Sequence, residues 1–292
     1  IAYVQAALDA GLEVDQFAPR LAFFFNGHNN VFQEVAKFRA ARRMWAHIMR
    51  DRFGAKDPKS LKLRFHTQTG GVTLTAQQPQ NNVVRVALQG FAAVCGGTQS
   101  LHTNGFDEAL ALPTENAARI ALRTQQILAH ESGVTDTVDP FAGSYFVEAL
   151  TDEIETRAQE LIGRVDELGG SVEAIAFIKS EIEESAFGYH ERYRTGQDIV
   201  VGVNKYEEDD IEVEEILRVD PETERDQLER LKVFKENRDQ ALATKRLEEL
   251  KSASEGTDNL LPYIKQALKD HCSVGEVCGA MREQFGEYRP EH

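Results

Sequence analysis

Amide, imidazole and hydroxyl side chains gather in three segments of this sequence, each at or just beyond the end of an apolar stretch. The segments are Asn26 to Asn30, His66 to Gln78 and Gln99 to Asn104. Side chains of this kind bind and orient a ligand through hydrogen bonds, and an imidazole can also exchange a proton. Turns ordinarily favour Gly, Asn and Pro over His and Gln, so we favour a binding site over the alternative of plain polar turns.

The elements that must position these segments follow a repeated order. The continuous apolar run Leu21 to Phe25 and the alternating run Leu61 to Phe65 are each typical of a strand. Helical spacing follows over Val31 to Phe53, Asn82 to Val94 and Asn116 to Glu131. Strand, polar loop and helix, repeated, predict a parallel α/β sheet, and in a barrel of this class the loops after the strands carry the chemistry.

From Asp139 onward the pattern is almost entirely helical. The expected helices cover 147–168, 172–193, 228–250 and a pair within 260–285, with a short strand-like run at 199–203. The acidic stretch Glu207 to Glu215 is typical of a solvated linker or a partner-facing surface.

Composition excludes several classes of function. The 292 residues include 48 acidic and 33 basic side chains, a formal charge of -15, which argues against nucleic acid or an anionic membrane as a partner. Three scattered cysteines form no disulfide framework and no metal-ligand spacing, so we expect no bound metal and a reducing, cytoplasmic location. No apolar run approaches a membrane span. The first residues already carry a helix face, so we expect sequence upstream of Ile1.

Five long strings carry a family resemblance. They are Pro19 to Ala46, Leu63 to Pro79, Gly96 to Thr114, Asp139 to Thr151 and Val201 to Tyr206. In this order they resemble the large subunits of methylmalonyl-CoA mutases and of the related isobutyryl- and 2-hydroxyisobutyryl-CoA mutases. Strings of this length and low degeneracy do not arise by chance as short motifs do.

The resemblance implies a fold and an activity. The fold is the C-terminal part of a (β/α)8 TIM barrel followed by a mostly helical extension, with the last strand-helix units in 1–135, a helical segment closing the barrel in 136–206, and an acidic linker with helices in 207–292. The activity is that of an adenosylcobalamin-dependent radical isomerase of acyl-CoA thioesters, an intramolecular transferase, with (R)-methylmalonyl-CoA and succinyl-CoA as the expected pair. Isobutyryl-CoA and 2-hydroxyisobutyryl-CoA are the alternative substrates.

The resemblance also implies roles for individual residues. Arg20 and Phe24 resemble the coenzyme A contacts, since a guanidinium suits phosphate and an aromatic ring suits the pantetheine or adenine portion. The family often has serine at Ala22, so one hydroxyl contact is missing here. His66 and Gln99, with Gln68, would line the interior near the substrate as the catalytic set. The cofactor contacts would be Gln68, Gly71, Val72, Asn104, Glu108, Ala109 and Leu112, with Val72 standing where methylmalonyl-CoA mutases often carry tryptophan.

Several of these residues have a structural alternative. His66 could be a satisfied core histidine, and Glu108 could be an ordinary acid in the first turn of a helix. Arg39, Arg42 and Arg43 could bind phosphate, but we favour solvated charge on an amphipathic helix. His271, Cys272 and Cys278 match no closed metal site and are interpreted as packing residues.

The family's cobalamin-binding motif, Asp-x-His-x-x-Gly, has no counterpart here. The nearest string, Asp270 to Gly275, places the histidine directly after the aspartate. Cobalt would then be held either by a small cobalamin-binding subunit or by a domain that has been cut from this chain, and we favour the subunit. A second large subunit and a GTPase chaperone are the other expected partners. Two other hypotheses stay open: a non-catalytic homologous partner subunit, and a β/α barrel enzyme without cobalamin.

Overall fold

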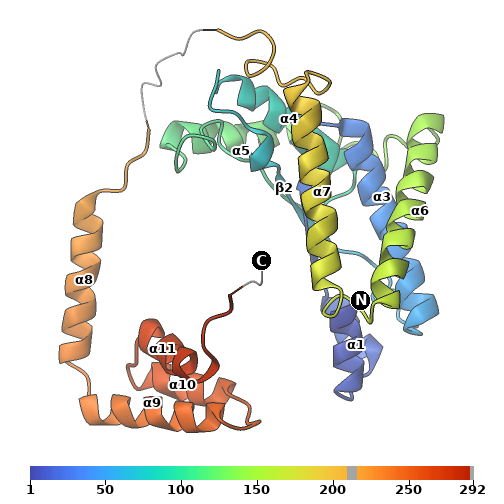
Figure 1. Ribbon diagram of the computed structural model, residues 1–292. Helices are drawn as coiled ribbons and strands as arrows, with labels where there is room; N and C mark the ends of the chain where they lie inside the picture. Colours follow the sequence, from blue (N-terminus) through green and yellow to red (C-terminus); the bar gives the residue numbers. More distant parts are fainter. Residues whose placement is uncertain (209–215, 290–292) are drawn as a thin grey trace. The chain divides into compact units, whose positions relative to one another are not determined.

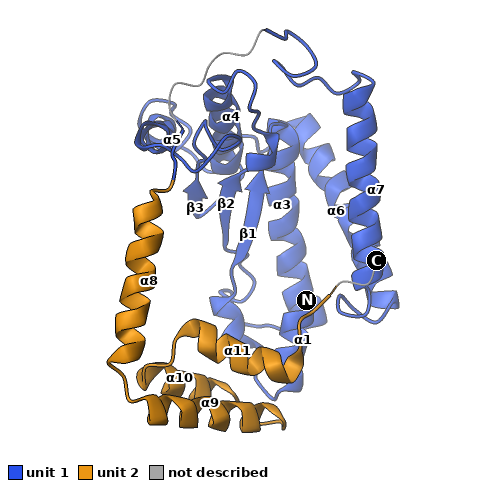
Figure 2. Cartoon of the chain, turned by 60° about the vertical axis from the view of Figure 1, so that its left-hand side comes forward, with its two compact units in different colours: residues 1–218 blue, residues 219–292 orange. Residues whose placement is uncertain are grey.

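The computed structural model describes residues 1–208 and 216–289 of the chain. Two compact units divide it, Ile1–Arg218 and Val219–His292, shown in separate colours in Figure 2. The predicted boundary at residue 135 falls inside the first unit and stays a prediction. Most of the acidic stretch 207–215 lies outside the described residues.

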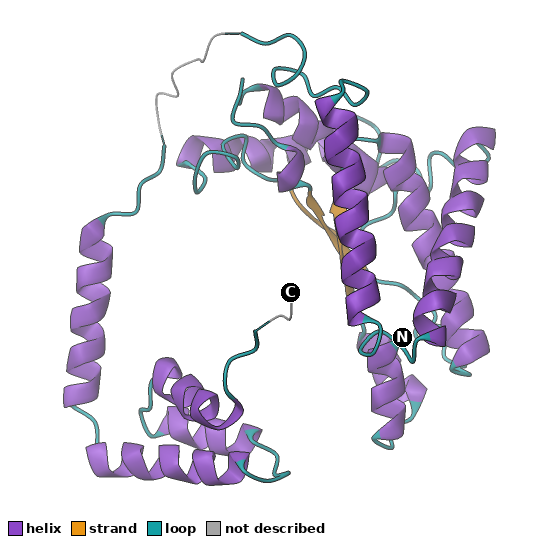
Figure 3. Ribbon diagram, in the orientation of Figure 1, coloured by secondary structure: helices purple, strands orange, loops and turns teal. Residues whose placement is uncertain are grey.

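Helices dominate both units, and within the described residues the strands are confined to the first unit (Figures 1 and 3). The first unit contains α1 (Ala2–Asp9), α2 (Val14–Phe17), η1 (Ala18–Arg20), β1 (Phe23–Gly27), α3 (Val31–His47), η2 (Ile48–Arg52), β2 (Phe65–Thr69), η3 (Gly71–Thr73), α4 (Asn81–Cys95), β3 (Ser100–His102), α5 (Glu115–His130), α6 (Tyr145–Glu167) and α7 (Ile175–Arg194). The second contains α8 (Pro221–Glu236), α9 (Gln240–Ser254), α10 (Leu261–Lys269) and α11 (Val274–Phe285).

The strands form one parallel sheet in the order β1-β2-β3, which confirms the α/β class with a parallel sheet. The second strand is shifted from its prediction: pairing begins at Phe65, where the apolar run ends. Leu63 is buried and Leu61 packs against the same core, although neither residue belongs to the strand. The apolar run therefore indicated burial and did not locate the paired residues.

Alternate side chains give the sheet two different faces. On one face, Phe25 and Phe65 contact Phe38 of α3 in an aromatic cluster, with ring centroids 5.0 to 5.9 Å apart. Ala93 of α4 belongs to the same core, so both helices cover this face. Because side chains alternate along a strand, the intervening residues of each strand point to the opposite face.

Ion pairs fasten α3 to α6, which corrects the expectation of solvated charge on this helix. Arg39 donates to Asp139 (3.1 Å) and Glu148 (2.7 Å), and Arg43 pairs with Asp152 and Glu155. The partners lie 100 to 112 residues away in the sequence, so helical spacing could not identify them.

A third arginine of α3, Arg42, bonds the carbonyl of Gly96, where α4 ends. Burial lowers the pKa of this guanidinium. The three arginines are therefore engaged in holding helices together.

Two further expectations of secondary structure are wrong. The run 199–203 is a closed loop, because the Asn204 side chain accepts from the Val200 amide and donates to the carbonyls of Tyr193 and Asp198. The single helix expected over 228–250 is two helices. Asp239 caps the second one by accepting from the Leu242 amide (2.9 Å).

The second unit has its own small core, formed by α9, α10 and α11. Leu250, Ala267 and Val277 are among its buried residues, and Cys272 is buried there too. Cys278 is exposed. Across the described ranges, no helix is long and apolar enough to cross a membrane.

Candidate functional site

The open face of the sheet carries three of the side chains that the sequence singled out, Phe24, His66 and Gln68. The parallel register aligns Phe24, His66 and Ser100 in one row across the three strands. The next row toward the carboxyl ends is Asn26, Gln68 and His102. Aligned residues of neighbouring strands point to the same face, so the rows form one polar surface opposite the aromatic core.

His66 belongs to this surface and not to the core. The side chain is half-buried, its Nδ1 lies 2.7 Å from the Ser100 hydroxyl, and its ring centroid lies 5.1 Å from that of Phe24. The alternative of a core histidine is therefore wrong. The hydroxyl of Ser100 fixes the ring orientation and leaves Nε2 for a ligand.

Gln68 and Asn104 form the centre of the site. The Gln68 amide donates to Asn104 Oδ1 (3.1 Å), and the Asn104 backbone amide donates to the Thr69 hydroxyl (2.9 Å). Asn104 is only 2% exposed, and within the described residues its Nδ2 has no hydrogen-bond acceptor. A buried donor without an acceptor costs about 1–3 kcal/mol, which an accepting ligand atom would recover.

Gly71 lies directly against this pair. A Cβ at this position would come within 2.8 Å of Asn104 Nδ2 and 3.2 Å of Glu108 Oε1. The glycine therefore permits an approach that no other residue allows without displacing a neighbour. Glu108 lies in a turn, and α5 begins only at Glu115, so the alternative of a first-turn helix acid is wrong.

An exposed apolar surface adjoins the polar residues. Val72 is 83% exposed and Leu112 is 58% exposed, and Ala109 between them in sequence is exposed as well. Leu112 is held by an antiparallel bridge to Leu217. Val72 and Ala109 directly follow Gly71 and Glu108 in the chain, so exposed apolar side chains border the polar site.

Two predicted residues lie toward the other end of the sheet. Arg20 is exposed and ends η1, just before the amino end of β1. Gln99 precedes β3, and both ends of its amide are bonded to backbone: Oε1 accepts from the Phe65 amide (2.6 Å) and Nε2 donates to the Gly97 carbonyl (3.0 Å). A catalytic role for Gln99 stays a prediction.

The structure adds residues that the sequence did not single out. Ser100 orients His66, and Thr69 holds the backbone of Asn104. Parallel register could have indicated Ser100, because it occupies in β3 the position of His66 in β2. Nothing in the local sequence indicates the bond from Asn104 to Thr69, which joins residues 35 apart.

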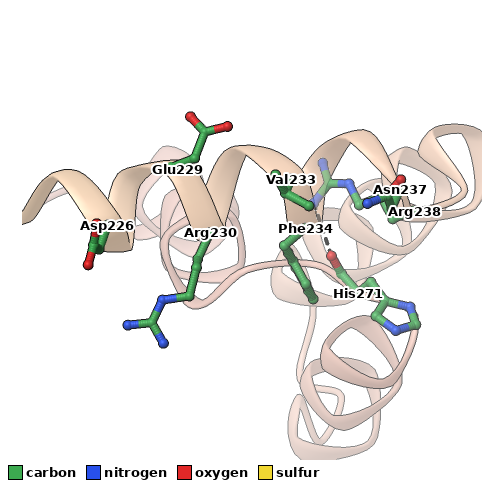
Figure 4. A pocket seen from close by; sticks show the side chains of 8 residues that line it. All are labelled: Asp226, Glu229, Arg230, Val233, Phe234, Asn237, Arg238 and His271. Carbon is green, nitrogen blue, oxygen red and sulfur yellow. Dashed lines mark hydrogen bonds between the residues drawn. The ribbon is translucent and has the colours of Figure 1, made fainter.

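A separate groove of about 790 Å³ lies in the second unit (Figure 4). Val233 and Phe234 of α8 line it with His271, whose carbonyl accepts from Arg238 (3.0 Å). None of the predicted site residues lines this groove. No group of three or more metal-binding side chains is found in residues 1–208 and 216–289.

The site on the sheet thus combines amide and imidazole donors, one carboxylate and an apolar surface, an arrangement that orients a ligand by hydrogen bonds. The fold and this site together define the chain as an α/β protein with a ligand-orienting face on a parallel sheet. The family model for methylmalonyl-CoA mutase matches residues 1–287, and the chain belongs to this family. The resemblance drawn from the five strings is confirmed.

Three relatives show the extent of the similarity. Human mitochondrial methylmalonyl-CoA mutase is 46% identical over 291 residues, 98% of this chain and 39% of the human protein. Methylmalonyl-CoA mutase of Cereibacter sphaeroides is 49% identical, covering 99% of this chain and 41% of that protein. The 2-hydroxyisobutanoyl-CoA mutase large subunit of Aquincola tertiaricarbonis is 44% identical, covering 99% and 52%. The chain therefore spans about two fifths to a half of the length of these relatives.

Proposed function

We propose that this chain forms one wall of the active site of an adenosylcobalamin-dependent acyl-CoA mutase, an isomerase of the intramolecular transferase type. The observation that carries the proposal is the buried Nδ2 of Asn104, which lacks an acceptor among the described residues beside Gly71 and Glu108. A ribose hydroxyl is an acceptor and a donor at once. It could accept from Asn104 and donate to the carboxylate of Glu108.

The order of residues along the sheet supports a substrate that runs along its open face. Arg20 precedes the amino end of β1, Phe24 and His66 are the second residues of β1 and β2, and Gln68 and Asn104 lie toward the carboxyl ends. In this proposal Arg20 pairs with a phosphate of coenzyme A and Phe24 packs on the pantetheine portion. His66 then donates to the thioester region, oriented by Ser100.

The remaining cofactor contacts follow from the same geometry. When bound, adenosylcobalamin supplies the homolytic bond cleavage that starts the rearrangement. Gln68, Asn104 and Glu108 would hold the adenosyl group, while Gly71, Val72, Ala109 and Leu112 would pack against the corrin ring. The chain's own contribution is orientation and exclusion of water, which is the usual protein contribution when a cofactor carries the chemistry.

Assembly and location complete the proposal. The parallel sheet is proposed as the C-terminal part of a (β/α)8 barrel whose interior is the polar face. Proposed partners are a small cobalamin-binding subunit, a second large subunit and a GTPase chaperone. A cytoplasmic location stays a proposal, since the human and mouse relatives carry the word mitochondrial in their names.

We propose (R)-methylmalonyl-CoA and succinyl-CoA as the substrate pair. The 44% identity to a 2-hydroxyisobutanoyl-CoA mutase large subunit favours that hydroxyacyl thioester as the second candidate. A non-catalytic partner subunit is the alternative of another class. The retained set of Gln68, Asn104 and Glu108 supports the catalytic assignment over this alternative.

The test reconstitutes the full-length protein with adenosylcobalamin and a cobalamin-domain partner. Acyl-CoA esters are added one at a time, and the absorbance of the cobalamin and the isomer ratio are followed. We expect one ester to be isomerised with a matching absorbance change. If no ester gives either signal, the catalytic assignment is wrong and the non-catalytic alternative takes its place.

A further inference from the structure

Gln89 of α4 is a fully buried polar side chain in contact with two of the site's loops. It is 0% exposed and belongs to α4, which covers the core face of the sheet. Gln89 therefore contacts the loops from the side of the core and not from the open face. Neither end of its amide points to solvent. A buried amide must have partners for its two donors and its acceptor, and the identity of those partners defines what the residue holds.

The partners of Gln89 come from the loops after β1 and β2. Nε2 donates to Asn29 Oδ1 (2.5 Å) and to the Thr73 hydroxyl (2.6 Å), while Oε1 accepts from the Gly70 amide (2.8 Å). One side chain thereby joins Asn29, which follows β1, to both ends of the turn that follows β2.

The turn is fixed from both sides of Gly70. The Gly70 amide also donates to the Gly27 carbonyl (2.8 Å), and the Gly70 carbonyl accepts from the hydroxyl of Thr73 (2.6 Å). The hydroxyl that Thr73 uses for this bond is the one that accepts from Gln89. The next residue in the chain is Gly71, whose position against Asn104 and Glu108 leaves no room for a methyl group.

We infer that Gln89 is a positioning residue for the site: it fixes the Gly70–Thr73 turn and thereby the place of Gly71 beside Asn104 and Glu108. This inference rests on the proposed function for the identity of the ligand, an adenosine nucleoside. The contacts themselves do not depend on that identity. Gln89 acts through Gly70 and is not assigned a contact with the ligand.

The test uses Gln89→Met in the full-length protein, because methionine has similar length and cannot form these hydrogen bonds. Amide hydrogen exchange is measured for the peptide covering residues 69–74, together with the affinities for 5'-deoxyadenosine and for coenzyme A. We expect about tenfold faster exchange in this peptide and about tenfold weaker nucleoside binding, with coenzyme A affinity unchanged.

Two comparison variants separate positioning from general stability. Ser60→Ala removes a buried hydroxyl bonded to Asp15 (2.7 Å) near the other end of β2, and should lower overall stability without speeding exchange in residues 69–74 more than elsewhere. Gln89→Glu keeps an acceptor for Gly70 and should restore slow exchange relative to methionine. If Gln89→Met does not fold, Thr73→Val is measured in its place, because it removes the hydroxyl that accepts from Gln89 and donates to the Gly70 carbonyl.

The outcomes are distinguishable. An unchanged rate of amide exchange in residues 69–74 of Gln89→Met overturns the positioning role, whether or not the affinity for 5'-deoxyadenosine changes. If the unmodified protein binds no 5'-deoxyadenosine, the proposed function fails, and the exchange data alone decide whether Gln89 fixes the turn. Faster exchange with unchanged nucleoside affinity also overturns the inference, because the turn would then not govern the site.

Discussion

The side-chain amide of Gln68 donates to Asn104 Oδ1 across 3.1 Å and so fixes the orientation of the Asn104 side-chain amide. With its oxygen engaged, Asn104 must present Nδ2 to the space beside Gly71 and Glu108. The pair thus sets the polarity of the site before any ligand enters it.

The first prediction concerns the donor that this pair presents. Asn104→Asp keeps the shape and the acceptor for Gln68 but replaces Nδ2 by a carboxylate oxygen near Glu108. We expect binding of 5'-deoxyadenosine to weaken by about tenfold to a hundredfold, because a donor is lost and like charges face each other. Calorimetric titration measures the affinity for 5'-deoxyadenosine. The control is Asn116→Asp, the same substitution at an exposed position. An unchanged affinity would remove Asn104 from the site.

The second prediction concerns the space at Gly71. Gly71→Ala places a methyl group 2.8 Å from Asn104 Nδ2, so Asn104 or the turn must move. Nucleoside affinity should fall about tenfold or more, and the free energy of unfolding should fall by about 1–3 kcal/mol. Gly163→Ala is the matched control, since nothing lies within 4 Å of that position in α6 and the change should stabilise the helix by about 0.5–1 kcal/mol. Equal nucleoside affinities in the two variants would contradict the close approach.

The third prediction concerns the attachment of α6 to α3. Arg39 has hydrogen bonds to Asp139, Glu148 and Thr151, and its pairing with Glu148 lowers the pKa of that carboxyl. Arg39→Met should reduce the free energy of unfolding in urea by roughly 1–2 kcal/mol. In the control Arg157→Met, which removes an exposed pair within α6, the loss should stay below about 0.5 kcal/mol. Similar losses in both variants would show that the bonds of Arg39 contribute little to the stability of the fold.

The fourth prediction concerns pH and the second unit. Arg238 is 3% exposed and pairs in a bidentate way with Glu276 (2.6 and 2.7 Å), which also closes a capping box with Ser273. These bonds, above all the one from Arg238, hold the pKa of Glu276 well below its ordinary value of 4.5.

A carboxyl whose folded pKa is lowered stabilises the fold fully above its unfolded pKa, and this stabilisation is lost as the pH falls through the folded value. Helix α11 should therefore exchange its amide hydrogens faster as the pH drops below about 4.5, after correction for intrinsic exchange rates. The variant Glu276→Gln should lack this pH dependence. If both proteins respond to acid alike, another group is responsible.

The sequence predicted what depends on local pattern. The bounds of α4 and α5 were within one residue of the helical spacing. The polar segments were expected to follow the strands, but residues 66–69 of the second segment belong to β2 and residues 100–102 of the third form β3. What failed depended on distant partners. Arg39 and Arg43 looked solvated because their acidic partners lie far along the chain, on α6 and at Asp139 just before it. The start of β2 was misplaced because Leu61 and Leu63 are buried without strand pairing. The break before α9 did carry a local signal in the cap residue Asp239, which the apolar spacing on both sides obscured.

At the site, residue types were predictable but contacts were not. Gln68 and Asn104 were both singled out, yet no spacing rule indicates that one orients the other, because they meet only through the pairing of β2 with β3. Gly71 was assigned to the cofactor contacts, and the structure shows that Asn104 and Glu108 lie directly against it.

The three-stranded sheet also has two borders. Among the described residues, β1 and β3 each pair with β2 alone, so the outward side of each outer strand has no strand partner. Side chains bond two of the outward carbonyls: Lys37 donates to that of Asn26 and Thr98 to that of Ser100. Edge strands of this kind pair with further strands, either with a polypeptide that continues the sheet or with another molecule of the same protein. A preparation of these 292 residues should therefore associate increasingly with concentration, and a polypeptide that supplies the adjoining strands should suppress that association.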